Sequence, residues 1–174
     1  MKATLEVINR MQAEGVIAHY AIGGAVGATF YLEPAATLDV DIFVILPYEP
    51  EGSLVSLGRI YEYLQARGYK AQDEHIVIEG WPVQFLVPAT ELEKQAVVGA
   101  LPERLEDITI WVMSETDLVL IALQTGRRKD HLRILQFLEQ GIVDLKMLKI
   151  LIERYGLAAK WQAFKHRYLE GRNE

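Results

Sequence analysis

Residues 22–45 read IGGAVGATFYLEPAATLDVDIFVI and are the most informative stretch of this chain. Gly23 and Gly24 follow an apolar segment and open a predicted helix, and fourteen residues separate them from Asp39-Val40-Asp41 in a second apolar strand. Alternate side chains of a strand project to the same face, so we expect Asp39 and Asp41 to lie together. Adjacent carboxylates repel each other and normally need a cation or a raised pKa.

The glycine pair and the aspartates suggest one chemistry when they are taken together. A Gly-Gly turn at a helix start offers bare backbone N–H groups to a phosphate, and paired carboxylates hold a metal ion, as phosphoryl transfer requires. Alone, Gly23 and Gly24 fit a tight turn of any α/β protein. The alternative for Asp39 and Asp41 is incidental polar alternation, but both flanks are apolar and Asp is a poor strand former. The functional interpretation is therefore favoured for the aspartates.

This pattern resembles the signature of the DNA polymerase beta-type nucleotidyltransferase superfamily, with a slightly longer gap before the Asp-x-Asp pair. Thr37 matches the Thr-x-Asp-x-Asp context, although it also fits an ordinary strand entry. Within that superfamily the chain resembles the AbiEii-like nucleotidyltransferases of bacterial toxin–antitoxin systems. Their helical half carries an Arg-x-Lys-Asp segment, which matches Arg127-Arg128-Lys129-Asp130 here. The match is most specific over residues 22–46 and weaker in the C-terminal half.

The resemblance implies a fold, a division of the chain and a reaction. The fold class is α+β, with a nucleotidyltransferase-type mixed sheet flanked by helices over residues 1–113 and a C-terminal helical bundle over residues 114–174. The reaction is Mg²⁺-dependent transfer of a nucleoside monophosphate from an NTP to a hydroxyl of RNA, protein or a small molecule. A cognate antitoxin or another operon product would be the partner. The implied metal ligands are Asp39 and Asp41, and the implied nucleotide-binding residues are Gly23, Gly24, Thr37, Arg127, Lys129 and Asp130.

The chain also departs from the family pattern. Gln84 stands where a third carboxylate is expected to act as a base; an amide cannot usefully accept a proton, although it can hydrogen-bond a water or a hydroxyl. Glu79 is a substitute carboxylate, but a surface charge in a hairpin turn is the better interpretation. Ala35-Ala36 and Ala122 occupy positions where the family carries basic residues. For Arg127, Lys129 and Asp130 the alternative is a helix start, with Asp130 favoured by the helix dipole.

These departures leave other functions open. One alternative is a catalytically impaired nucleotide- or partner-binding module on the same fold, with Gln84 as its cause. Another is a purely structural partner in an operon-encoded complex, which would have no affinity for nucleotides. Robust nucleotide binding would exclude the structural partner, and measurable transfer would exclude the impaired module.

Composition narrows the class of protein further. The chain has 174 residues, 51% of them hydrophobic, which fits one compact domain or a small domain with a helical extension. A net charge of −6 argues against broad nonspecific binding to nucleic acids, although Lys and Arg gather between Arg127 and Arg172. The sequence lacks cysteine, a membrane-length apolar run and an N-terminal signal segment, so we expect a cytoplasmic protein with no disulfides and no membrane contact.

Hydrophobic periodicity and turn residues predict the order of the elements. The strands around Gly80-Trp81 are expected to form a hairpin, and Ser114 and Asp144 are expected to cap helices. Trp161, Phe164 and Tyr168 are interpreted as a core stripe. The expected helices span 3–14, 24–33, 53–68, 90–98, 114–125, 127–140 and 144–156, followed by a last one around Trp161, and the expected strands span 16–22, 38–46, 74–79, 82–87 and 107–112.

Overall fold

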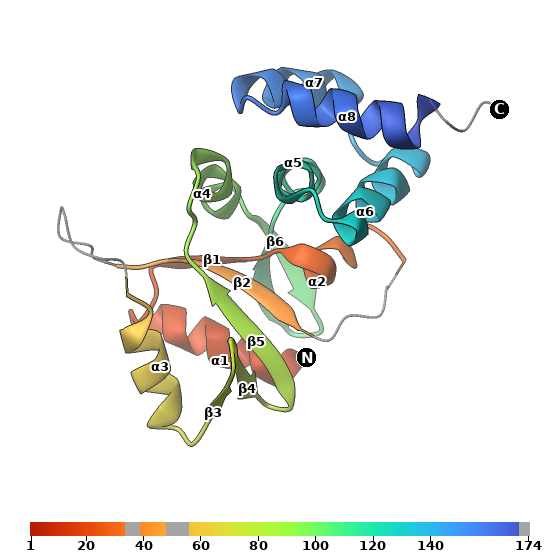
Figure 1. Cartoon of the computed structure of the whole chain (residues 1–174). Helices are drawn as coiled ribbons and strands as arrows, with labels where there is room; N and C mark the ends of the chain where they lie inside the picture. Colours follow the sequence, from red (N-terminus) through yellow and green to blue (C-terminus); the bar gives the residue numbers. More distant parts are fainter. Residues whose placement is uncertain (34–38, 48–55, 171–174) are drawn as a thin grey trace.

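The computed structural model describes residues 1–33, 39–47 and 56–170 of the chain. Within these ranges the protein contains eight helices and one mixed seven-stranded sheet (Figure 1). The α+β class expected from the sequence is therefore confirmed. Within the described residues no helix is long and apolar enough to cross a membrane.

The sheet combines two parallel pairs with antiparallel hairpins. Its strand order is β3-β4-β5-β2-β1-β7-β6, with β2 parallel to β5 and β1 parallel to β7. The neighbours β1 and β2 are antiparallel, as are the hairpins β3–β4, β4–β5 and β6–β7. The strands are β1 (His19–Ile22), β2 (Val40–Ile45), β3 (Lys70–Gln72), β4 (His75–Ile78), β5 (Trp81–Leu86), β6 (Leu101–Leu105) and β7 (Ile108–Val112).

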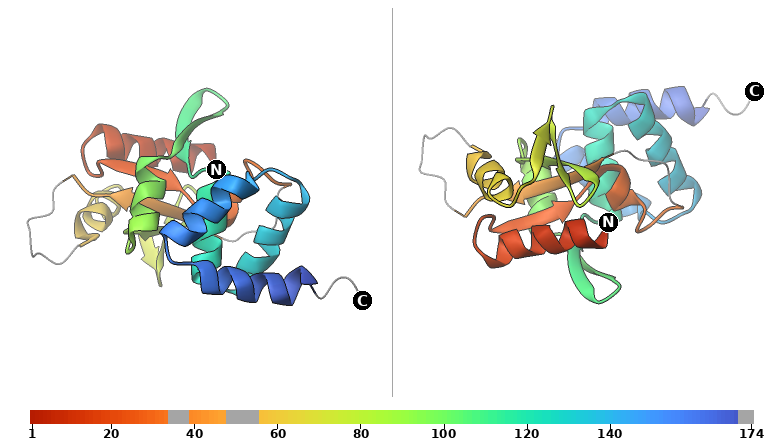
Figure 2. Two further views of the ribbon diagram at one scale, coloured as in Figure 1. Left: turned by 90° about the horizontal axis from the view of Figure 1, so that it is seen from above. Right: turned by 90° about the horizontal axis from the view of Figure 1, so that it is seen from below.

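Helices cover both faces of this sheet. One face carries α1 and α3, the other carries α4 and α5, and the last helices, α7 and α8, lie beyond α5 (Figures 1 and 2). The β6–β7 hairpin projects from one edge (Figure 2). The helices are α1 (Lys2–Ala13), α2 (Gly24–Ala28), α3 (Gly58–Gln65), α4 (Glu91–Val98), α5 (Glu115–Thr125), α6 (Arg128–Glu139), α7 (Leu145–Arg154) and α8 (Ala158–Tyr168).

The sheet separates two hydrophobic cores, and β2 shows how the sequence builds both. Its even-numbered residues Val40, Ile42 and Val44 are fully buried in the core that also contains Leu5, Ile8 and Met11 of α1. Phe43 lies in the opposite core, under α4 and α5. Because alternate side chains share a face, Asp41 faces the same side of the sheet as Phe43. The strand thus directs its carboxylate toward the C-terminal helices.

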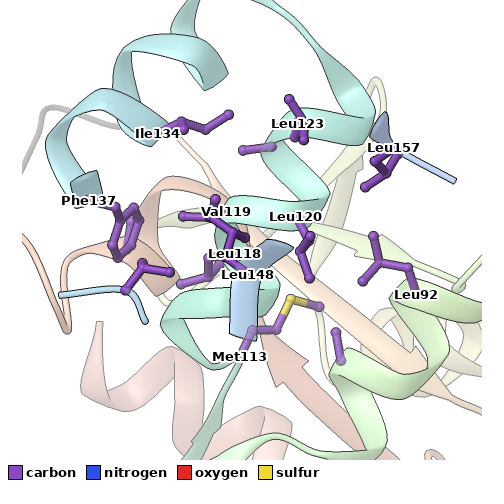
Figure 3. Packing of buried hydrophobic residues seen from close by; sticks show 14 of the residues in the cluster. Leu92, Met113, Leu118, Val119, Leu120, Leu123, Ile134, Phe137, Leu148 and Leu157 are labelled. Atoms are coloured by element: carbon purple, nitrogen blue, oxygen red, sulfur yellow. The ribbon is translucent and has the colours of Figure 1, made fainter. Parts of the chain in front are cut away.

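The second core is organised around α5. Leu118, Val119, Leu120 and Leu123 point from α5 toward the sheet, toward α4 and toward the last three helices (Figure 3). A helix with neighbours on several sides is apolar over most of its surface, and the sequence of α5 has that character. Residues on both sides of residue 113 contribute to this core.

Most expected elements are present, with shifted ends. Helix α2 has only five residues. It ends at Ala28, and the chain then turns at Thr29 and Phe30. Ser114 and Asp144 cap α5 and α7 through their side chains, as expected. The expected cap Ser53 lies outside the described residues, and α3 begins at Gly58.

Two strands, β3 and β6, were not expected from the sequence. All three residues of β3 are exposed, and β6 is largely exposed. Both are edge strands held by a single neighbour, so their side chains need not alternate between polar and apolar. The hairpin at Gly80 is confirmed, with Glu79 and Gly80 both at positive φ in a two-residue turn between Ile78 and Trp81.

Candidate functional site

A cavity of about 400 Å³ lies where the ends of β2 and β5 meet α4, α5 and the start of α6. Its size falls within the range of small-molecule sites. Four acidic and three basic side chains share it with an apolar wall. The lining residues are Gly24, Asp39, Asp41, Phe43, Gln84, Leu86, Val87, Ala89, Glu93, Leu118, Ile121, Ala122, Thr125, Arg127, Lys129, Asp130 and Arg133.

The cavity brings together residues that the sequence separates by more than a hundred positions. Of the nine residues predicted for the site, seven line it: Gly24, Asp39, Asp41, Gln84, Arg127, Lys129 and Asp130. Gly23 does not line it, but its N–H donates a 3.0 Å hydrogen bond to the backbone oxygen of Asp41. Thr37 lies outside the described residues.

Asp41 and Gly24 are in close contact. Gly24 has φ +57°, and a Cβ at this position would lie 1.9 Å from Oδ2 of Asp41. Only glycine tolerates both the backbone conformation and the approach of the carboxylate. On its other side Asp41 is in register with Gln84 of the parallel strand β5. Gln84 therefore stands beside the half-buried aspartate, on the wall of the same cavity.

Two effects raise the pKa of Asp41, and a nearby positive charge would oppose both. Burial raises the pKa of its carboxyl, and the charge of Asp39 raises it further. Arg127, Lys129 and Arg133 act in the opposite direction. Oxygen ligands from two neighbouring carboxylates suit Mg²⁺, which usually takes only one or two of them and completes its shell with water or phosphate oxygens. The described ranges contain no cluster of three or more His, Asp or Glu that could form an all-protein metal site.

Asp39 immediately precedes β2 and is less buried than Asp41. Its side chain is 37% exposed, and its Oδ2 lies 3.4 Å from Nε2 of His75 on β4. The four histidines of the chain are scattered along the sequence, so nothing in their spacing singles out His75. The β4–β5 hairpin brings it to the aspartate, and no local spacing in the sequence signals that contact.

Asp130 is the anchor of the basic side of the cavity. It is only 1% exposed, and its carboxylate accepts hydrogen bonds from Nε of Arg127 at 2.7 Å and from Nη2 at 3.3 Å. The backbone N–H of Arg127 donates a further bond at 3.3 Å, and Nη1 of Arg133 lies 3.5 Å away. The hydrogen bond that Arg127 donates to Asp130 raises the pKa of Arg127. Asp130 therefore holds the side chains of Arg127 and Arg133. The sequence explained its position through the helix dipole, which does not predict these contacts.

Two charged lining residues, Arg133 and Glu93, were missed by sequence reasoning. Arg133 follows Asp130 by three positions, a spacing that puts both on one helix face and could have revealed it. Glu93 forms a capping box with Thr90, which Thr-x-x-Glu signals. Oε2 of Glu93 accepts hydrogen bonds from the N–H groups of Ala89 and Thr90, and Oε1 accepts one from Nε2 of Gln124. Its carboxylate is thus engaged in joining α4 to α5.

Glu79 does not belong to the site. It sits in the β4–β5 turn, accepts a 2.6 Å hydrogen bond from the hydroxyl of Tyr69, and does not line the cavity. Its interpretation as a turn residue is confirmed. It does not replace the carboxylate that Gln84 lacks.

No family model matches the chain, and the curated proteins yield no match either. The chemistry of the cavity is therefore the basis on which a function is assigned.

Proposed function

We propose that this protein is a Mg²⁺-dependent nucleotidyltransferase of the DNA polymerase beta type, with AbiEii-like character, that transfers a nucleoside monophosphate from an NTP to a hydroxyl. One observation carries the proposal: a single cavity has an acidic pair, Asp39 and Asp41, and a basic group on α6. A mixed sheet followed by four helices supports the proposed nucleotidyltransferase fold with a C-terminal helical bundle.

Each group of lining residues has a role in this proposal. Asp39 and Asp41 would hold Mg²⁺, which would supply positive charge to neutralise the phosphates of the NTP. Arg127 and Lys129 contact the phosphates from α6, and Gly24 lets the carboxylate of Asp41 lie against the start of α2. The apolar wall accommodates the base and the ribose. The acceptor hydroxyl attacks the α-phosphorus, and the bond to pyrophosphate breaks.

The proposed reaction needs a base that takes the proton of the acceptor hydroxyl. Gln84 lies beside Asp41 but cannot take the proton, because an amide is not a useful base. Glu93 and Asp130 are the other carboxylates of the cavity besides the aspartate pair, and both are occupied by N–H donors. These observations favour a second candidate function, a module that binds nucleotide but transfers little or nothing. RNA, protein or a small molecule is the acceptor of the active form, and a cognate antitoxin or other operon product is the proposed partner.

Calorimetric titration with each of the four NTPs, with and without Mg²⁺, tests the shared part of both functions. We expect Mg²⁺-dependent binding that the double variant Asp39→Asn/Asp41→Asn abolishes. The matched control is Glu62→Gln/Glu74→Gln, which removes two charges from exposed positions outside the cavity and should bind normally. A double aspartate variant that binds Mg-NTP as tightly as wild type would refute the site.

Transfer is then measured separately from binding. Radiolabelled NTP is incubated with total RNA and with lysate protein, and incorporation of label is compared with release of pyrophosphate. Incorporation that depends on Asp39 and Asp41 supports the transferase. Binding without incorporation in either pool supports the impaired module.

A further inference from the structure

Arg133 is a largely buried cation in the wall of the cavity. Its side chain is 16% exposed, whereas that of Arg127 is 59% exposed. Burial lowers the pKa of its guanidinium, and the charges of Asp130 and Asp41 raise it. Arg133 thus lies within the electrostatic reach of both sides of the cavity. The Arg-x-Lys-Asp segment ends three residues before it.

The partners of Arg133 leave its donors available. Among residues 1–33, 39–47 and 56–170 it forms one ion pair, at 3.5 Å to Oδ1 of Asp130, and no hydrogen bond. Asp130 is already occupied by the shorter bonds from Arg127. A buried guanidinium is costly unless it is paired and hydrogen-bonded, and its rigid fork of donors suits phosphate oxygens. The structure therefore holds an arginine whose preferred partner is a further anion.

The positive charge of this wall exceeds what the protein neutralises there. Asp130 lies three residues after Arg127 and three before Arg133, so one buried carboxylate serves two arginines, while Lys129 adds a third cation to the lining. The acidic pair of the cavity, Asp39 and Asp41, comes from the strand side. An anion between α6 and β2 would be attracted by the arginines and would need a cation to approach the aspartates.

We propose that Arg133 is a further substrate-binding residue, whose guanidinium donates paired hydrogen bonds to the phosphate chain of the substrate, with Asp130 as the positioning residue for Arg127 and Arg133. This inference rests on the proposed function for the identity of the substrate as an NTP. It adds a second arginine to the phosphate site. It also changes the role of Asp130, which positions the arginines and does not itself contact the nucleotide.

The test compares Arg133→Gln and Arg133→Lys with the matched control Arg128→Gln, which removes the same charge from an exposed position of α6 outside the cavity lining. The probes are ATP, AMP and inorganic triphosphate, with Mg²⁺, titrated by calorimetry. Loss of a charge-assisted hydrogen bond predicts that Arg133→Gln weakens ATP and triphosphate about tenfold to a hundredfold and AMP much less. Arg133→Lys keeps the charge without the fork and should weaken ATP less than Arg133→Gln does. Arg128→Gln should bind like wild type.

The outcomes separate this inference from the proposed function. Wild type that binds triphosphate but not ATP, with loss on Arg133→Gln, supports the anion site and contradicts the nucleotidyltransferase. A folded Arg133→Gln variant, checked by circular dichroism, that binds ATP and triphosphate like wild type overturns the role of Arg133. An equal loss in Arg128→Gln overturns it as well, because the effect would then be a general one of charge. Wild type that binds neither ligand refutes both proposals. If Arg133→Gln does not fold, Arg133→Lys decides: unchanged ATP affinity overturns the inference.

Discussion

At the scale of single residues, the contact between Gly24 and Asp41 governs the acidic side of the cavity. Asp41 can occupy its place against the start of α2 only because position 24 has no Cβ. Its neighbour Gln84 then determines whether the site has a base. Both contacts involve the carboxylate of Asp41. Substitutions at Gly24 or Gln84 should therefore change ligand binding at the cavity.

Gly24→Ala should impair both stability and the site. Alanine at φ +57° costs about 1–2 kcal/mol, and its Cβ would also displace the carboxylate of Asp41. The control is Gly15→Ala, because Gly15 has φ +71° with nothing within 4 Å of an added Cβ. We expect thermal unfolding to show a larger loss for Gly24→Ala, and calorimetry to show that it alone loses Mg-NTP binding. Equal behaviour of the two variants would mean that the Gly24–Asp41 contact has no consequence.

Gln84→Asp should restore the carboxylate that the proposed reaction lacks. A positioned general base is typically worth about 10²–10⁴-fold in rate, so label incorporation should rise from a low wild-type value. Gln84→Glu should be measured beside it, since its carboxylate reaches one methylene further. Without Mg²⁺ both variants should melt below wild type, because a third carboxylate adds repulsion beside Asp41. Gln65→Glu on α3, outside the cavity, is the control for charge alone. Robust wild-type transfer that falls in both Gln84 variants would identify the glutamine itself as the working residue.

At the scale of elements, the first turns of α6 carry the basic residues of the cavity. The same helix also contacts α8 through His131. His131 of α6 forms edge-on ring contacts with Phe164 and Tyr168 of α8, and its Nδ1 lies 3.4 Å from the Tyr168 hydroxyl. Trp161 and Phe164 stack and are buried, so these two members of the predicted core stripe are confirmed. The arginines are therefore carried by a helix that packs on α5 and also contacts α8 through His131.

This helix contact should weaken in mild acid. Burial lowers the pKa of His131 in the folded protein, and the nearby charge of Arg167 lowers it further, against a smaller effect of Asp130. Below the ordinary value of 6.5 the unfolded chain binds the proton first, so stability should fall as the pH drops from 6.5 through the folded pKa and should be unaffected above 6.5. Urea unfolding from pH 7.5 to 5 measures this slope. His131→Gln should reduce it, and His166→Gln, at an exposed position of α8, should leave it unchanged. Equal slopes in all three proteins would contradict the assignment.

The elements also show the limits of sequence reasoning. Helices with a buried stripe, such as α1, or with a capping side chain, such as α5 and α7, could be predicted because these signals are local. The edge strands β3 and β6 could not, because backbone pairing with one neighbour holds them while their side chains face solvent. Helix α2 was expected to continue to Glu33, because the first proline after it is at position 34. It ends at Ala28 instead and is followed by turns.

At the scale of the whole molecule, the cavity lies between the sheet and the C-terminal helices, and so does one of the two cores. That core contains Phe43 and Leu92 from the first part of the chain and Leu123, Leu148 and Phe164 from the second. Its shared packing means that neither part buries its apolar surface alone. The site should therefore exist only while both parts are folded together.

Cooperative unfolding of the whole chain is the expected result. Of the three tryptophans, Trp81 lies on β5 and Trp161 on α8, so variants that retain only one of them report on each part separately. In urea, each fluorescence transition should coincide with the far-ultraviolet circular dichroism transition of the same variant. A Trp161 signal that changes at clearly lower urea than the circular dichroism would show that the C-terminal helices unfold separately.

The sequence by itself determined the α+β class, the positions of most helices and central strands, and most of the charged residues that line the cavity. It could do so because periodicity, caps and the Asp-x-Asp alternation act within a few residues. Only the tertiary structure decided that α6 faces the end of β2, that Asp130 turns inward to hold Arg127 and Arg133, and that His75 reaches Asp39. These contacts arise from strand register and helix packing, which depend on the simultaneous burial of two cores rather than on any local pattern.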